Sequence, residues 1–177
     1  MRPGDEAQLI QQAKGRDAEA LSELYRRHVD QIYRYVRYRI ADAVAAEDLT
    51  AEVFLRAVEG LTAYEDRGTP FAAWLYRIAQ ARVADFWRAT QHGQPVTIDA
   101  AETWPAEEDA TTRDVLEHRR LLAALRQLTE EQQHAVVLRY VQGLSHAEIG
   151  VIMEKTEGAV KALQRRALEA LSRLLMK

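Results

Sequence analysis

Apolar residues recur at intervals of three and four along almost the whole chain, and this spacing constrains the fold more than any other feature. Val and Ile follow the same spacing, and the alternating apolar and polar runs of half-buried strands are nearly absent. Segment 17–40 shows the pattern clearly, with an expected apolar side formed by Leu21, Leu24, Tyr25, Ile32 and Val36. We therefore expect an all-α protein of seven or eight helices.

Residues that favour helix starts mark where several of these helices should begin. Asp17 and Asp42 suit the capping position of the helices that follow them, and Pro70 suits the first position of a helix that continues to about residue 90. Two further starts have the capping-box pattern, in which Ser or Thr precedes Glu or Gln by three residues; they are Thr129 with Gln132 and Ser145 with Glu148.

The helical pattern is interrupted between residues 93 and 110. Gly93, Pro95 and Pro105 break helices there, and residues 93–114 hold six acidic residues and one arginine. We expect two small helical domains, at 1–92 and 111–177, joined by a flexible acidic linker at 93–110. A long functional loop inside a single domain is the alternative interpretation of this segment.

Composition excludes several classes of protein. The chain has no cysteine, so disulfides, thiolate metal sites and cysteine nucleophiles are impossible. The five histidines show no metal-binding spacing, and phosphate-binding or dinucleotide-binding glycine motifs are absent. We therefore expect a protein that is not an enzyme and needs no cofactor or metal. The polar start of the chain and the lack of any apolar run near the ~18 residues of a membrane span predict a cytoplasmic protein without membrane insertion.

The C-terminal segment has the spacing of a helix-turn-helix. Gly150 is small where two helices must approach closely, and Ile149, Ile152, Val160 and Leu163 can form the core between them. The turn position four residues after Gly150 tends to require a positive φ angle and is usually glycine, but here it is Glu154.

The second of these helices is basic. The chain from Lys155 to Lys177 has six basic and two acidic residues, although the whole protein has a net charge of −3. Lys161 and Arg165 are four residues apart and share a helix face that could enter the major groove of DNA. An ordinary helical hairpin with a solvated basic face is the alternative.

Two faces in the N-terminal half are candidate interaction surfaces. On the helix after Asp42, the side opposite the apolar one carries Asp48, Glu52, Leu55 and Glu59, which could dock a partner. On the helix after Pro70, Trp74, Arg77 and Arg88 point away from the apolar side, as suits a phosphate backbone and unstacked bases. Arg82 falls on the core side, where an ion pair is expected. A solvated surface is the alternative for each face.

Three segments resemble, in this order, parts of the extracytoplasmic-function class of bacterial RNA polymerase sigma factors. The resemblance covers nearly the whole chain except the linker. Residues 46–57 (AEDLTAEVFLRA) are similar to the polymerase-binding helix of that family. Residues 71–79 (FAAWLYRIA), with Asp85 and Arg88, resemble its promoter-melting helix. Residues 138–149 (LRYVQGLSHAEI) and 156–161 (TEGAVK) resemble its minus-thirty-five-binding domain.

The resemblance implies a function and partners. It implies a factor that binds core RNA polymerase and directs promoter recognition and transcription initiation, is a monomer when free, and is held inactive by an anti-sigma partner. Contacts to polymerase are implied for Asp48, Glu52 and Leu55; contacts to minus-ten DNA for Tyr64, Arg67, Trp74, Arg77 and Arg88; and contacts to minus-thirty-five DNA for Thr156, Lys161, Gln164 and Arg165. A stand-alone helix-turn-helix regulator, which would bind palindromic sites as a dimer, is the alternative.

Overall fold

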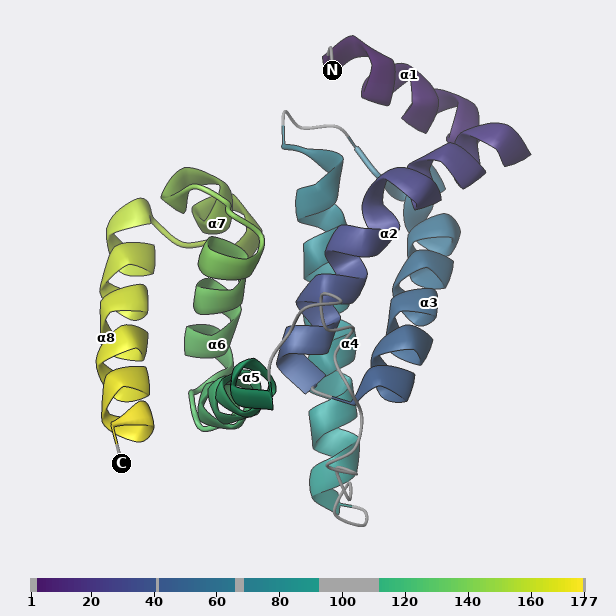
Figure 1. Ribbon diagram of the computed structural model, residues 1–177. Coiled ribbons are helices and arrows are strands. Elements are labelled where there is room, and N and C mark those ends of the chain that lie inside the picture. The colour runs from purple at the N-terminus through teal and green to yellow at the C-terminus, as the bar shows by residue number, and fades with distance from the viewer. Residues whose placement is uncertain (1–2, 41, 66–68, 93–111, 177) are drawn as a thin grey trace.

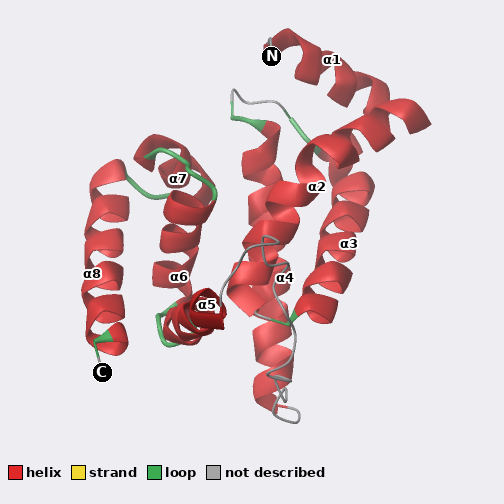
Figure 2. Ribbon diagram, in the orientation of Figure 1, coloured by secondary structure: helices red, strands yellow, loops and turns green. Residues whose placement is uncertain are grey.

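The structure is a computed structural model that describes residues 3–40, 42–65, 69–92 and 112–176, and every regular element in these ranges is a helix (Figures 1 and 2). The expectation of an all-α protein built from small helical domains is therefore confirmed. None of the described helices is both long and apolar enough to cross a membrane. The acidic segment 93–110 lies outside the described residues.

The N-terminal domain consists of α1 (Pro3–Lys14), α2 (Ala18–Ile40), α3 (Ala43–Gly60), the short 3-10 helix η1 (Leu61–Ala63) and α4 (Phe71–His92). Helices α2, α3 and α4 pack against one another, and α1 lies across α2 and η1 (Figure 1). The core between the three long helices includes Ile32, Val36, Val53, Leu75 and Val83. Sequence analysis did not identify α1, because its polar and acidic composition obscures an apolar side that consists of little more than Ile10 and Ala13.

The C-terminal domain consists of α5 (Thr112–Leu125), α6 (Glu130–Val136), a π-helical continuation η2 (Val137–Val141), α7 (His146–Met153) and α8 (Glu157–Leu175). Helix α8 packs against α5, α6 and α7, as the yellow helix beside the green ones in Figure 1. A second apolar cluster joins α5, α6 and α8, and its members are Leu122, Ala124, Leu125, Leu128, Val136, Ala167 and Leu171.

Most predicted helix starts agree with the structure. The carboxylate of Asp17 accepts a hydrogen bond from the Ala20 amide, and that of Asp42 accepts one from the Ala45 amide, both at 2.9 Å. Both capping boxes are formed, at the starts of α6 and α7. Pro70 differs by one residue, because α4 begins at Phe71 and the Pro70 carbonyl accepts the first hydrogen bond, from the Ala73 amide.

The two domains share an apolar core. Val137, Leu138, Ile149, Ile152 and Val160 of the C-terminal domain belong to the same buried cluster as the core of the N-terminal domain. The contact is made where α4 meets α7 and where α2 meets η2 and α5. Since apolar burial drives association as it drives folding, this shared core holds the domains together directly.

Candidate nucleic-acid and partner interfaces

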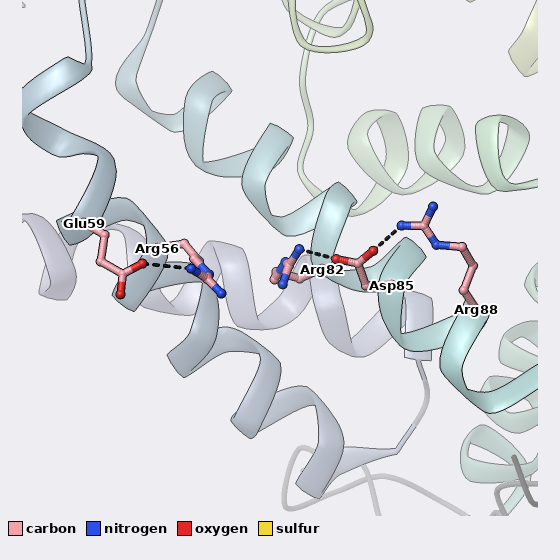
Figure 3. A network of polar contacts seen from close by, with 5 residues as sticks. All are labelled: Arg56, Glu59, Arg82, Asp85 and Arg88. Carbon is pink, nitrogen blue, oxygen red and sulfur yellow. Dashed lines mark hydrogen bonds and ion pairs between the residues drawn. The ribbon is translucent and has the colours of Figure 1, made fainter. Parts of the chain in front are cut away.

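Helix α3 presents an exposed face that no other described element covers; it is apolar along its centre and charged at its edges. Asp48, Glu52 and Leu55 all lie on it, and Leu55 is 59% exposed. Val44 and Val58 are also exposed and lie on the same face. Sequence analysis missed these two valines, although their spacing from Leu55, eleven residues before and three after, was a readable signal. Within the helix, Arg56 pairs with Glu59 at 3.0 Å (Figure 3).

Two aromatic residues extend this face toward α2. The rings of Tyr25 and Phe54 meet edge to face, with their centroids 4.8 Å apart. Tyr25 is half exposed, so part of its ring lies at the surface beside Phe54. The apolar surface is therefore continuous from α3 to α2, as a protein-binding surface requires.

Helix α4 carries the predicted basic and aromatic side chains. Trp74 is half buried, Arg77 is 41% exposed, and Arg88 is more exposed still. The carboxylate of Asp85 accepts hydrogen bonds from both Arg88 and Arg82 (Figure 3). The hydrogen bond from Arg88, assisted by the charge of Arg82, lowers the pKa of Asp85 below its ordinary value. The ion pair expected for Arg82 is thus confirmed.

Tyr64 does not face solvent. It is only 7% exposed and packs against two rings on the other side of the following segment, with ring centroids 5.4 Å from Phe71 and 4.9 Å from Trp74. In this conformation most of the Tyr64 ring is covered by Phe71 and Trp74, and its contact with minus-ten DNA stays a prediction. Arg67, predicted in the same loop, lies outside the described residues.

Arg77 is engaged by the C-terminal domain. Its Nη2 donates a hydrogen bond to the Val151 carbonyl at 2.7 Å, and its Nη1 lies 3.4 Å from the Glu154 carboxylate. The adjacent Tyr76 hydroxyl donates to the Gln142 side chain at 3.0 Å. The face of α4 that was predicted to hold DNA is therefore partly covered by α7 and the turn after it.

The helix-turn-helix has the geometry that its sequence predicts. A side chain on Gly150 would place its Cβ 2.7 Å from the Lys155 carbonyl oxygen, so only glycine fits between α7 and the turn. Glu154 has the expected positive φ, 54°, in the left-handed region. Thr156 caps α8, and its hydroxyl accepts a hydrogen bond from the Ala159 amide at 3.2 Å.

On α8, the structure separates the predicted DNA contacts into two groups. Lys161 and Arg165 are exposed, and each forms a long ion pair within the helix, to Glu157 at 3.5 Å and to Glu169 at 3.9 Å. Gln164 is instead 4% exposed, so in this conformation its side chain is covered, and its contact with minus-thirty-five DNA stays a prediction. Its amide donates to the Ala135 carbonyl at 3.2 Å and its oxygen lies 2.9 Å from His146, so it joins α8 to α6 and α7.

Polar groups are buried where α2 meets α6. Arg39 is fully buried; it donates to the Gln133 side chain at 3.1 Å and to the Tyr35 hydroxyl at 2.5 Å, while its nearest carboxylate, Glu130, is 3.9 Å away. His134 is also fully buried, and neither ring nitrogen has a hydrogen-bond partner among the described residues. Burial, together with the charge of Arg39, lowers the pKa of His134 well below the ordinary 6.5, so this histidine is neutral.

Buried but incompletely paired cations make a contact less stable than apolar packing alone would. At Arg39, Nη2 has no hydrogen-bond partner among the described residues, which lowers what this buried contact contributes to stability. Among the described residues, no group of three or more acidic or histidine side chains is placed to hold a metal ion.

Comparison with known proteins identifies two family models in this chain. The model for sigma-70 region 2 matches residues 24–93, and the model for sigma-70 region 4 matches residues 118–171. Among curated relatives, the ECF RNA polymerase sigma factor BldN of Streptomyces coelicolor is 41% identical over 172 residues; the match covers 95% of this chain and 65% of that protein. The ECF RNA polymerase sigma factor SigD of Mycobacterium tuberculosis is 33% identical, with 92% of this chain and 80% of the relative covered.

Solved structures support the same fold. CnrH, in complex with the cytosolic domain of CnrY, matches with a TM-score of 0.72 at 24% identity, covering 94% of each chain. The sigma factor RpoE of Bartonella quintana, in complex with the anti-sigma factor NepR, matches with a TM-score of 0.67 at 21% identity, covering 88% of this chain and 96% of the other.

Proposed function

Because the chain belongs to the extracytoplasmic-function class of RNA polymerase sigma factors, we propose that it binds core RNA polymerase and directs it to specific promoters to initiate transcription. The observation that carries the proposal is the presence, in one chain, of a region 2 domain with an exposed α3 face and a region 4 domain with an exposed basic helix. The protein acts by binding polymerase and DNA, and it catalyses no reaction of its own.

Polymerase docks on the exposed face of α3. Leu55, with Val44 and Val58, supplies the apolar centre that a stable protein contact needs, and Asp48 and Glu52 supply charge at its edge. A helix of the polymerase with apolar residues at matching intervals and basic residues beside them is complementary to this surface. The acids would speed and orient the encounter, and the apolar centre would slow dissociation.

The minus-ten element is held by α4 and the loop before it. Arg77 and Arg88 suit contacts to phosphates of the single strand, and Trp74 offers part of a ring for stacking with an extruded base. Arg67, in the segment before α4, is proposed as a further contact. Tyr64 is proposed to fix the start of that segment, and its contact with minus-ten DNA stays a prediction.

The minus-thirty-five element is held by the N-terminal half of α8 in the major groove. Lys161 and Arg165 are free to exchange their weak intrahelical ion pairs for DNA phosphates or base edges, and Thr156 lies at the helix start, where phosphates are favoured. Gln164 holds this helix against α6 and α7 through its contacts with Ala135 and His146.

Both DNA surfaces can engage one promoter only if the domains separate. Arg77 must leave Glu154 and the Val151 carbonyl before it can reach the minus-ten strand. We propose that the free factor is a closed, cytoplasmic monomer with domains at 1–92 and 111–177, and that binding to polymerase opens it. In the open complex, the acidic linker at 93–110 threads the polymerase near its RNA exit path. An anti-sigma partner prevents docking on polymerase. The relatives solved with anti-sigma or cytosolic partner domains motivate the last point.

Run-off transcription tests the function directly. The purified chain is added to core polymerase on a promoter library, and we expect transcripts with discrete starts only when both are present. A gel shift with and without core distinguishes the alternative, because a stand-alone helix-turn-helix regulator would bind its DNA tightly without polymerase. Strong DNA binding by the chain alone, with no transcripts, would reject the sigma-factor assignment.

A further inference from the structure

Gln164 is a polar residue on the buried side of α8. Its neighbours on that side of the helix are apolar, and Val160, Leu163 and Ala167 are all at most 6% exposed. A buried amide costs free energy unless both its oxygen and its nitrogen make hydrogen bonds, whereas an apolar side chain of similar size would carry no such cost. Packing alone therefore does not account for a glutamine at this position.

The Gln164 side chain joins three helices. Its Nε2 donates a hydrogen bond to the Ala135 carbonyl, in the last turn of α6, at 3.2 Å. Its Oε1 lies 2.9 Å from Nε2 of His146, the first residue of α7. Because a carbonyl can only accept, the amide nitrogen faces Ala135 and the amide oxygen faces His146. The His146 Nε2 therefore carries a proton and donates to Gln164. We refer to these two hydrogen bonds, from His146 through Gln164 to Ala135, as the α8 bridge.

Two contacts fix the angle between α7 and α8. At the turn, Gly150 allows a close approach to the Lys155 carbonyl oxygen, which a Cβ on residue 150 would meet at 2.7 Å. At the other end of α7, the α8 bridge ties His146 to Gln164, inside α8. Hydrogen bonds are directional, so the bridge also restrains the rotation of α8 about its own axis, which apolar contacts alone hold less firmly.

The rotation of α8 decides where its exposed cations point. Lys161 lies three residues before Gln164 and Arg165 directly after it, so both side chains turn with Gln164. A change of rotation moves both cations relative to the floor of the major groove. A phosphate contact tolerates such a shift, because a long cationic side chain can reach a neighbouring phosphate oxygen, but hydrogen bonds to base edges require a defined position.

We infer that His146 and Gln164 are positioning residues for promoter specificity: through the α8 bridge they hold α8 at the angle and rotation at which it reads the bases of the minus-thirty-five element. Both act through α8, and the role requires neither side chain to touch a base. The inference rests on the proposed function and deepens it, because it separates discrimination between sequences from the charge-driven affinity that Lys161 and Arg165 supply.

Two promoter fragments test the inference, each bound by the complex of the full chain with core polymerase. The fragments share one minus-ten element. The first keeps the minus-thirty-five element of a promoter that the wild type transcribes, and the second carries the same bases in scrambled order. Fluorescence anisotropy measures both affinities, and their ratio measures discrimination between sequences.

We expect Gln164→Leu and His146→Phe to reduce this ratio about tenfold, as the loss of one base contact would. Each substitution keeps a side chain of similar size and removes the α8 bridge. Binding to the scrambled fragment should stay unchanged, because the cations still reach phosphates. His146→Gln should restore most of the ratio, since its amide can donate from near the position of the histidine Nε2.

Gln133→Leu is the matched control. Gln133 is 5% exposed and lies in the same domain, but its side chain bonds to Arg39 of α2 instead of to α8, so the ratio should equal that of the wild type. Wild-type ratios in both Gln164→Leu and His146→Phe would overturn the inference. So would equal losses on the two fragments, which indicate a weakened fold, or a ratio in His146→Gln as low as in His146→Phe. Failure of the wild-type chain to bind core polymerase would instead reject the proposed function.

Discussion

Arg77 of α4 and Glu154, in the turn between α7 and α8, form an ion pair across the two domains at 3.4 Å. Glu154 reaches this position from a left-handed backbone conformation, which glycine adopts more easily. The pair is exposed and contributes at most about 1 kcal/mol. The pair nevertheless links Arg77, which is proposed to hold the minus-ten strand, with the helix-turn-helix. This single contact therefore reports whether the domains are closed.

Replacing Glu154 with glycine should separate the stability of the turn from closure of the domains. Glu154→Gly relieves the left-handed backbone, which should stabilise the turn by up to about 1 kcal/mol, while loss of the ion pair should raise the open population roughly two- to fivefold. The chain has no cysteine, so spin labels on Ser22→Cys and Ser172→Cys report the distance between domains. Glu169→Gln, which changes charge away from the contact, is the control. An unchanged distance distribution in Glu154→Gly would contradict the prediction.

Gly150 should be the least replaceable residue of the helix-turn-helix. Gly150→Ala places a Cβ 2.7 Å from the Lys155 carbonyl oxygen, a backbone atom that cannot move alone, and we expect the free energy of unfolding to fall by about 1–3 kcal/mol. Gly158→Ala is a matched control in the first turn of α8, where a Cβ would meet nothing within 4 Å. Denaturant titration measures both. Equal stability of the two variants would show that the close approach of residue 150 to the Lys155 carbonyl does not require glycine.

Polymerase docking should depend on the charged edge of α3. We expect Asp48→Ala with Glu52→Ala to weaken core binding about fivefold or more, since charges near a docking centre contribute about 1 kcal/mol or more together, with helicity unchanged because both side chains are exposed. Fluorescence anisotropy with labelled factor measures the affinity. Glu19→Ala with Asp30→Ala removes the same charge from α2 and should bind normally. Normal binding by the first variant would remove these acids from the interface.

Sequence predicted the helices and the helix-turn-helix because local rules decide them. Asp17, Asp42 and the two capping boxes satisfy the free amides of their own helix starts, and Gly150 is required by a contact only five residues away. None of these features depends on how the domains meet.

The burial of individual side chains has the opposite cause, because it depends on distant parts of the chain. Tyr64 and Gln164 were expected on DNA-facing surfaces because a helical or loop pattern does not say which neighbour will cover a polar or aromatic side chain. Tyr64 is covered by α1 and α4, and Gln164 by α6 and α7, through partners 50 and 29 residues away in the chain. The closed contact of the domains could not be predicted either, because Arg39 and Gln133, which bond across it, are 94 residues apart.

The basic face of α8 should account for the salt dependence of minus-thirty-five binding. Lys161→Ala and Arg165→Ala should each weaken binding uniformly across sequences and reduce the slope of log affinity against log salt by about 1, because each removes one phosphate partner. Titration at several salt concentrations measures the slope. Arg173→Ala, an exposed cation at the far end of the same helix, should leave it unchanged. Slopes equal to wild type in both test variants would place this face away from DNA.

Acid should weaken the closed contact through His134. The pKa of His134 is lowered by burial and by the charge of Arg39. Tyr35, on α2, also faces the His134 ring, and Glu130, on α6, lies near Arg39. As pH falls, a base whose pKa is lowered in the folded state is protonated in the open or unfolded state before it is protonated in the folded one. The stability of the folded state that depends on neutral His134 is therefore complete above about pH 6.5 and is lost as pH falls further. The loss should approach about 1.4 kcal/mol per pH unit for one proton.

The measurement is the free energy of unfolding between pH 7.5 and about 5, for the wild type and His134→Gln. The free energy of unfolding of the variant should fall less than that of the wild type over this pH range, because glutamine fills a similar space without binding a proton. His118 serves as the control: burial lowers its pKa as well, but it is half buried and lies beside Tyr38. His118→Gln should therefore keep most of the wild-type pH dependence. An identical decline in His134→Gln and wild type would show that protonation of other groups accounts for the loss of stability in acid.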